Sequence, residues 1–316
     1  MKSITTHRVF TPVVFAAALA VVLAGGYRET KAGFSEGGAY KSPGYGARAW
    51  GMGGAAVATV NDESAVYWNP AMLALVPAHT IGATYIDLVP GAMAQQSQLA
   101  YVHILKSGNP DEDQNVAARH AIGALYTNLR LGIQSGENYN ENMFRLAYAY
   151  TPDYFLTFAI AGDVFASASE VKGFKSRGTS VDMAIRVMLT ENFTVGLVAR
   201  NAFSRYSYSD GADFNREREL ALGISSRSIA HVAVEGDLVW AHGAVARWIL
   251  GAESDYLFGV LALRAGFAVI NAGESRSVPY FGFGARVSQL SLHYNANLDT
   301  ENALADTHRF TLSVSL

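Results

Sequence analysis

From residue 79 onward, hydrophobic and polar side chains alternate with a period of two, as they do in β-strands that have one apolar face. The C-terminus shows this best, because Phe310, Leu312, Val314 and Leu316 share one face while Thr and Ser occupy the positions between them. Segments of about ten residues are long enough for a tilted strand to cross a bilayer. The pattern therefore predicts an all-β protein with membrane-crossing strands.

About fourteen such segments can be marked, and an even number is typical of a closed bacterial barrel. They lie near 79–88, 95–105, 118–129, 142–151, 154–166, 178–189, 192–203, 216–226, 229–240, 245–253, 256–268, 278–287, 290–297 and 305–316. We therefore predict that residues 79–316 form a transmembrane antiparallel β-barrel.

The links between these strands are expected to alternate between short turns and longer polar loops from the fourth strand onward. Thr190-Glu191 and Ser254-Asp255 are short turns, whereas Ser167–Arg177 and Ser204–Asn215 are long. Outer-membrane barrels have short periplasmic turns and longer outer loops, so this rhythm places both termini in the periplasm. The link Lys106–Ala117 departs from the rhythm because it is long where a short turn is expected.

A soluble β-sandwich or β-barrel would also alternate, but its charges would face outward. Here one face of nearly every strand carries charge, and a barrel of this size is too wide to fill with aliphatic side chains. The charges are either paired with one another in a polar lumen or in contact with a substrate. The predicted lumen charges are Arg145, Asp182, Arg186, Arg200, Glu235, Arg264 and Arg286.

Residues 1–32 have the three parts of a secretory signal peptide. A basic start that includes Lys2 and Arg8 precedes the apolar run Val9–Gly26, and Thr30-Lys31-Ala32 offers a cleavage site. A membrane-anchoring helix is the alternative interpretation of the apolar run. The sequence contains no second run of this length, so insertion into a membrane requires a closed barrel.

Composition narrows the function classes. Only 16% of the 316 residues are charged, against about 25% in an ordinary soluble domain, which suggests a second apolar surface. The net charge of -3 gives no reason to expect a nucleic-acid partner, and the absence of cysteine excludes a disulfide framework. The eight histidines lack metal-ligand spacing, so we expect no metal, no cofactor and no enzyme. A barrel hydrolase that uses His231 or His293 with a serine stays open as an alternative.

Residues 33–78 differ from the barrel because glycine is dense and alternation is absent. Glycine lets the backbone take left-handed turns and pack closely against other chain segments. Pro70 biases Asn69 away from the helical region, and the Asn69 side chain can bond to nearby backbone groups. Inside a barrel, such a segment would have to satisfy its backbone groups against lumen side chains, and Arg48 is expected to pair with a lumen carboxylate.

This stretch resembles the FadL-like outer-membrane transport superfamily, most closely its PorV/PorQ branch. The resemblance rests on Gly46-Ala47-Arg48-Ala49-x-Gly51-Met52-Gly53-Gly54-Ala55, on Asp62 with Ser64-Ala65, and on Tyr67-Trp68-Asn69-Pro70-Ala71. It implies that residues 33–78 form an N-terminal hatch in the periplasmic half of the lumen. The hatch motif then comprises Arg48, Gly51, Gly53, Gly54, Asp62, Asn69, Pro70 and Ala71.

The resemblance implies two functions. The first is passive uptake of hydrophobic small molecules, either long-chain fatty acids or hydrocarbons, across the outer membrane of a Gram-negative-type bacterium. Tyr206, Tyr208 and Phe214, expected in an outer loop, would then form an apolar entry or an aromatic girdle. The second is a docking barrel that holds or receives secreted proteins in a type IX-like pathway. The expected partners are accordingly outer-membrane lipid, a hydrophobic ligand and secreted proteins or components of their secretion system.

Overall fold

The structure is a computed structural model that describes residues 44–77, 79–88, 94–106, 119–132, 138–170, 175–209, 211, 213–241, 243–254, 257–272, 274–297 and 307–316. The predicted signal peptide (residues 1–32) and the first part of the predicted hatch (33–43) lie outside these residues.

The described residues form one sheet of fifteen antiparallel strands. The strands are β1 (Thr80–Asp87), β2 (Ala94–Lys106), β3 (Arg119–Gly132), β4 (Asn138–Asp153), β5 (Leu156–Ser169), β6 (Lys175–Thr190), β7 (Phe193–Tyr208), β8 (Asp213–Phe214), β9 (Glu219–Ile229), β10 (Val232–Ala241), β11 (Ala244–Ser254), β12 (Leu261–Ala272), β13 (Glu274–Val287), β14 (Leu290–Asn297) and β15 (His308–Ser315). Each of the fourteen predicted segments overlaps one of the long strands, and the two-residue β8 is the addition.

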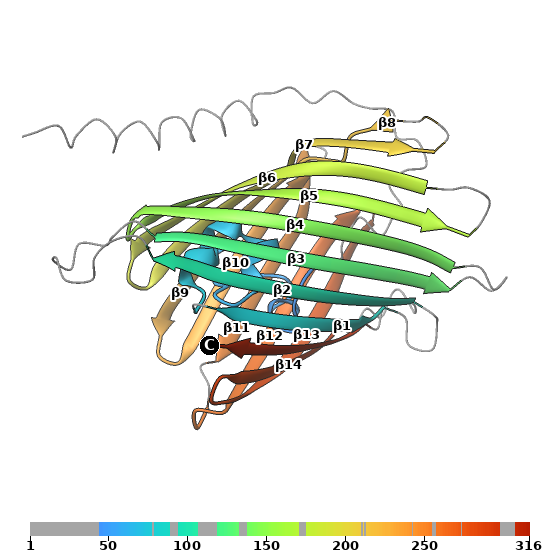
Figure 1. Cartoon of the computed structure of the whole chain (residues 1–316). Coiled ribbons are helices and arrows are strands. Elements are labelled where there is room, and N and C mark those ends of the chain that lie inside the picture. Colours follow the sequence, from blue (N-terminus) through green and yellow to red (C-terminus); the bar gives the residue numbers. More distant parts are fainter. Residues whose placement is uncertain are drawn as a thin grey trace, which may run out of the picture.

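The sheet closes on itself, as Figure 1 shows from the side. The first strand pairs with the last in continuous register from Thr80 opposite Ser315 to Asp87 opposite His308. β6 pairs with β7 and β7 with β9, while β8 only extends the end of β7. The prediction of a closed fourteen-stranded antiparallel barrel is therefore confirmed.

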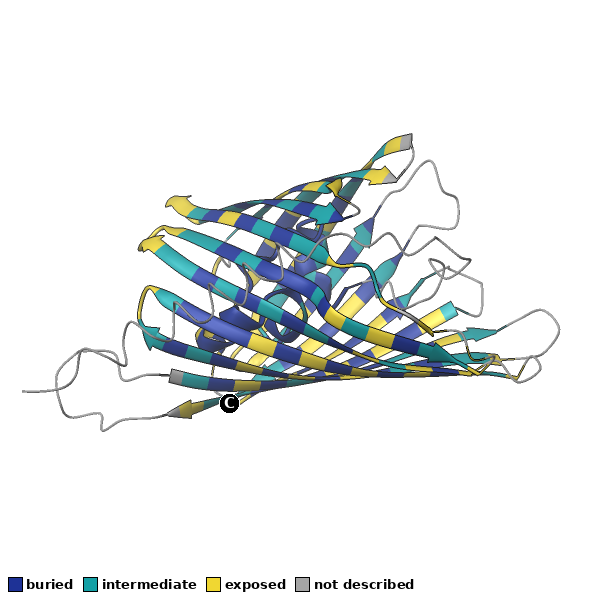
Figure 2. Ribbon diagram, turned by 90° about the horizontal axis from the view of Figure 1, so that it is seen from above, coloured by how far each residue is buried: buried dark blue, intermediate teal, exposed yellow. Residues whose placement is uncertain are grey.

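Alternation along the strands sets which side chains face in and which face out. In β15, Thr311 is 2% exposed while its neighbour Leu312 is 48% exposed. The same banding of buried and exposed residues runs along strands all round the wall (Figure 2). The outward face is mainly apolar and the inward face carries most of the polar groups, as the sequence predicts.

The links depart from the predicted rhythm on one side of the barrel. β10 is followed by β11 after two residues and β12 by β13 after one, at the end where longer loops were expected. Six residues separate β11 from β12, where Ser254-Asp255 was predicted to make a tight turn. Phe258 and Gly259 have φ values of 56° and 73°, so this apolar stretch turns instead of starting the strand early. The link after β2 lies outside the described residues.

Residues 44–77, called the inner segment below, lie inside the barrel (Figure 1). They contain the helices α2 (Ala47–Gly51) and α3 (Ala65–Trp68) and the 3-10 helix η2 (Pro70–Leu75), so the segment is partly helical. Its buried apolar side chains form one cluster with inward residues of the wall, such as Val102 and Leu125. No helix among the described residues is long and apolar enough to span a membrane.

Candidate functional site

The wall around the inner segment is lined with inward glycines. Two pairs lie side by side in the sheet register: Gly196 opposite Gly223, and Gly251 opposite Gly266. A Cβ atom at Gly266 would lie 2.0 Å from the carbonyl carbon of Met52, and one at Gly251 would lie 2.5 Å from the Met52 carbonyl oxygen. We call these four residues, together with Gly282, the glycine belt. Their lack of a side chain lets the inner segment lie with its backbone directly on the wall.

Glycines of the inner segment meet this belt. Gly53 and Gly54 have φ values of 74° and 88°, a left-handed conformation that strains other residues. A Cβ atom at Gly53 would lie 3.1 Å from the Phe267 backbone nitrogen. The Cα atom of Gly51 would lie 2.9 Å from a Cβ atom at Gly282. The glycines of the predicted hatch motif therefore supply both the turn and the close approach.

Arg48 ties the inner segment to β11. Its Nε and Nη2 atoms donate to the two oxygens of Glu253, both at 2.7 Å, and its Nη1 donates to Asp62 at 3.0 Å. Glu253 also accepts a bond from Nε of Arg264 on β12, at 2.5 Å. These side chains are largely buried. The paired hydrogen bonds between Arg48 and Glu253 therefore lie in surroundings of low dielectric constant, where bonds between charged groups are strong. Glu253, which the sequence analysis did not single out, is the lumen carboxylate expected for Arg48.

Asp62 is held ionised by its neighbours. Burial would raise the pKa of this carboxyl, but the charge of Arg48 and the hydrogen bond from Ser64 outweigh burial and lower the pKa. Both the backbone nitrogen and the hydroxyl of Ser64 donate to Asp62. Asp62 therefore fixes Arg48 from within the inner segment while Glu253 holds it from the wall.

Two lumen arginines satisfy the end of α3. Arg145 on β4 donates to the carbonyls of Val66 and Tyr67 at 3.4 and 3.3 Å, and Arg200 on β7 donates to that of Trp68 at 3.0 Å. These carbonyls are at the C-terminal end of a short helix, where they lack helical partners and favour cations. Arg145 is itself held by Asp163 on β5 and Asp182 on β6, both with contacts of 2.6 Å.

Two carboxylates of β10 satisfy backbone donors of the inner segment between its helices. Asp237 accepts from the backbone nitrogen of Ala56 at 3.1 Å, and Glu235 accepts from that of Ala58 at 2.5 Å. Glu235 also accepts from the hydroxyl of Thr59. A non-helical stretch thereby receives from the wall the bonds that a helix would make internally.

Asn69 joins two parts of the inner segment. It is fully buried, donates to the Val57 carbonyl at 2.6 Å and accepts from the Ala71 backbone nitrogen at 3.0 Å. Its φ of -153° is extended, and Pro70 begins the 3-10 helix directly after it. The Asn69-Pro70-Ala71 tripeptide therefore stops α3, starts η2 and anchors the stretch near Val57.

The inner segment also bonds to both strands of the closing seam, where β1 meets β15. The Tyr45 hydroxyl donates to the Gly82 carbonyl at 2.9 Å, and the Ser313 hydroxyl donates to Glu63 at 2.6 Å. A Cβ atom at Gly82 would lie 2.1 Å from the same Glu63 oxygen. Burial, assisted by the nearby charge of Asp62, raises the pKa of Glu63 to about 8. The carboxyl is therefore mostly neutral at pH 7.

The structure places the remaining predicted residues as follows. Arg186 is buried, and its Nη1 atom donates to the Tyr154 carbonyl at 3.5 Å. Arg286 is exposed because it lies at the end of the barrel. His293 is buried on the inward face, but His231 lies in the exposed turn between β9 and β10, with φ 62°. No group of three or more histidines and carboxylates in the described ranges is arranged to hold a metal ion.

The aromatic residues predicted in an outer loop lie elsewhere. Tyr206 and Tyr208 belong to β7, which continues past the predicted end of the strand because residues 203–208 pair with β6. Tyr206 is buried against Phe165, with ring centroids 5.3 Å apart. Phe214 belongs to β8 and pairs with Tyr206, and its side chain lies outside the described set.

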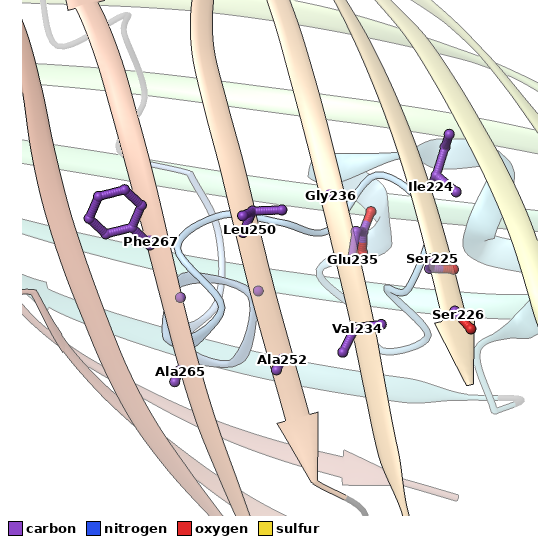
Figure 3. A pocket seen from close by; sticks show the side chains of 12 residues that line it. Ile224, Ser225, Ser226, Val234, Glu235, Gly236, Leu250, Ala252, Ala265 and Phe267 are labelled. Atoms are coloured by element: carbon purple, nitrogen blue, oxygen red, sulfur yellow. The ribbon is translucent and has the colours of Figure 1, made fainter. Parts of the chain in front are cut away.

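A hollow of about 500 Å³ lies in the outward face of β9 to β12 (Figure 3). Exposed Ile224, Leu250 and Phe267 stand beside outward residues with small side chains. The full lining is Ile224, Ser225, Ser226, Val234, Glu235, Gly236, Leu250, Gly251, Ala252, Ala265, Gly266 and Phe267. This surface, called the outer hollow below, lies across the wall from Met52, because Gly251 and Gly266 form part of both.

Comparisons with known proteins show the fold. No family model matches the sequence, and no curated protein matches it. The toluene transporter TodX of Pseudomonas putida is similar in structure, with a TM-score of 0.61, 15% identity, and coverage of 86% of this chain and 99% of that one. The monoaromatic hydrocarbon channel CymD has a TM-score of 0.58 at 14% identity, covering 86% of this chain and 96% of that one.

The glycine belt generates the first prediction. Gly266→Ala should lower the free energy of unfolding by about 1–3 kcal/mol, because the new Cβ atom meets backbone that cannot move aside. Gly162→Ala on β5 is the matched control, since nothing lies within 4 Å of its Cβ position. Urea unfolding of the folded barrel, followed by its mobility on unheated gels, measures both. Equal stability of the two variants would show that the close approach is unimportant.

The Arg48 contacts generate the second prediction. Arg48→Met should cost about 3 kcal/mol, because Glu253 and Asp62 lose a partner while they stay buried. Arg205→Met removes an ion pair to Asp213 whose side chains are exposed, so it should change the free energy of unfolding much less. The same unfolding assay compares them, and a loss no greater for Arg48→Met than for Arg205→Met would contradict the role of Arg48.

The Glu63 carboxyl generates the third prediction. Its folded pKa of about 8 lies above its ordinary value of 4.5, so its contribution to stability is complete below pH 4.5 and is lost as the pH rises to about 8. In Glu63→Gln this loss disappears. We expect the unfolding midpoint of the wild type to fall relative to the variant between pH 5 and 8. Parallel curves across this range would rule out the buried neutral carboxyl.

Proposed function

We propose that this chain is exported to the outer membrane of a Gram-negative-type bacterium, belongs to the FadL-like superfamily and lets hydrophobic small molecules pass without an energy source. The observation that carries this proposal is a closed barrel whose lumen holds a tightly bonded inner segment, in a fold shared with hydrocarbon channels.

The outward face supports a place in a membrane. Leu99, Phe144, Leu250 and Phe281 are among many exposed apolar side chains at outward positions. A closed antiparallel barrel leaves no unpaired strand edge, which is the condition for crossing hydrocarbon. The C-terminus lies beside the start of β1 at one end of the barrel, where the Leu316 backbone nitrogen donates to the His79 carbonyl at 3.1 Å. We assign this end to the periplasm because most of the two-residue turns lie there.

The inner segment is proposed to act as a hatch. Its ion pairs and buried apolar side chains occupy the lumen at the level of the glycine belt, which argues against an open water-filled pore there. A molecule that crosses must therefore pass beside the segment or shift it. An apolar molecule is suited to such a path, because it needs no hydration shell inside the barrel.

The names of two structural neighbours, a toluene transporter and a monoaromatic hydrocarbon channel, support a proposal for the cargo class. We propose hydrocarbons or long-chain fatty acids for this chain. The buried pair Phe165 and Tyr206, together with Tyr208 and Phe214 near the end of β7, marks the candidate apolar entry.

Uptake measurements test the proposed function. A Gram-negative host that lacks its own channel for hydrophobic compounds should take up radiolabelled toluene or oleate several-fold faster when it produces this chain. Uptake of a hydrophilic sugar, which serves as the control, should stay unchanged. Toluene and oleate uptake equal to that of the empty host would refute the proposal.

The PorV/PorQ branch implies a docking role instead, and purification distinguishes it. A barrel isolated in mild detergent as a monomer fits the transport function. A stable large complex with secreted proteins would favour docking.

A further inference from the structure

We propose that the outer hollow is a binding groove for the hydrocarbon chain of a membrane lipid. The inference rests on the proposed function only in that the barrel must lie in a membrane. It concerns the outside of the wall and not the path through the lumen.

The register of the sheet gives the outer hollow the shape of a trough. Ser226, Val234, Ala252 and Ala265 face outward and lie directly opposite one another on β9 to β12. Neighbouring strands are about 4.8 Å apart, so this row extends across about 14 Å of wall. Because three of its four side chains are small, the row forms a depression in a face that is otherwise bulky.

The next row forms one bank of the trough. Ile224, Gly236, Leu250 and Phe267 lie opposite one another in the same four strands, and the three large side chains among them are 52%, 65% and 42% exposed. These large side chains stand beside the row of small residues (Figure 3). An elongated, flexible and apolar molecule can lie along the foot of this bank and bury apolar area on both itself and the wall.

The chemistry of the lining selects hydrocarbon. None of its outward side chains is charged, and the Ser226 hydroxyl is the one outward polar group. A peptide segment laid into the trough would leave most of its backbone polar groups without partners, which is costly in an apolar setting. A second barrel would also fit poorly, because two convex walls meet along a narrow line. A lipid acyl chain has neither difficulty and is continuous with the lipid that would surround the outward face.

The wall behind the trough is supported from the lumen side by the inner segment. Gly251 and Gly266 lie between the two outward rows and carry no side chain toward the lumen, where the Met52 backbone packs on them. The strands cannot sag inward at this place, because the inner segment already fills the space. The trough therefore keeps its depth and is preorganised for a bound chain.

Photolabelling in vesicles tests this proposal. The probe is a phosphatidylethanolamine with a diazirine in the middle of one acyl chain, and mass spectrometry identifies the labelled peptides. In the wild type we expect label to concentrate on β9 to β12. Ala252→Phe fills the centre of the trough and should reduce that label roughly tenfold, as expected when about two methylene groups lose their contact.

Ala83→Phe is the matched control, because Ala83 is an exposed outward residue on β1, away from the trough. It should leave the labelling of β9 to β12 unchanged, and gel mobility verifies that both variants fold. Label spread evenly round the barrel, or unaffected by Ala252→Phe, would overturn the proposal. Efficient disulfide formation between copies carrying Leu250→Cys would also overturn it, by showing that a second barrel covers the trough. Labelling that fails while toluene uptake persists would reject the groove and leave the transport function intact.

Discussion

A chain segment enclosed by a barrel must find partners for its backbone N–H and C=O groups in the wall, because its short helices satisfy only some of them. In this protein the wall supplies those partners with charged side chains. Glu235 and Asp237 accept from backbone nitrogens, while Arg145 and Arg200 donate to carbonyls at the end of α3. The buried charges of the lumen are therefore explained first as partners of backbone.

This constraint also explains why glycine and charge occur together on the inward face. A carboxylate or guanidinium can reach the backbone of the inner segment only if that backbone lies close to the wall. The glycine belt allows the close approach at Met52 and Val57, and the β10 carboxylates bond to the two residues that flank Val57. The glycines and the charged side chains depend on each other. Without the charges, the inner segment would touch the wall but its backbone would lack hydrogen-bond partners. Without the glycines, the charges would be buried too far from that backbone to bond to it.

The sequence predicted the barrel well because alternation is a local property. The faces of β6, β10 and β15 follow from residue parity alone, and so do the inward positions of Arg145, Asp182 and Glu235. Partners were harder to predict, because they depend on register between strands and on the path of the inner segment. Asp163, Asp237 and Glu253 were not singled out for this reason, although each lies at an inward position.

The positions that the sequence predicted wrongly also have local causes. Tyr206 and Tyr208 were expected in a loop because Ser, Arg and Asp surround them, yet their backbone groups pair with β6. The apolar stretch before Leu261 looked like strand, but Phe258 and Gly259 adopt left-handed φ values that end pairing. Recurrent glycine at inward positions was a signal available in the sequence. It needed the strand boundaries before it could be interpreted.

The bonds of the inner segment to the closing seam have a consequence for the order of folding. Glu63 belongs to the part of the chain that is synthesised early, whereas Ser313 lies three residues before the last residue, in a strand that is synthesised last. The contact between Glu63 and Ser313 joins residues 250 positions apart, and contacts of such high sequence separation are the slowest to form. The inner segment can thus reach its final position only when the last strand has joined the wall. Docking of the inner segment therefore requires a completed barrel.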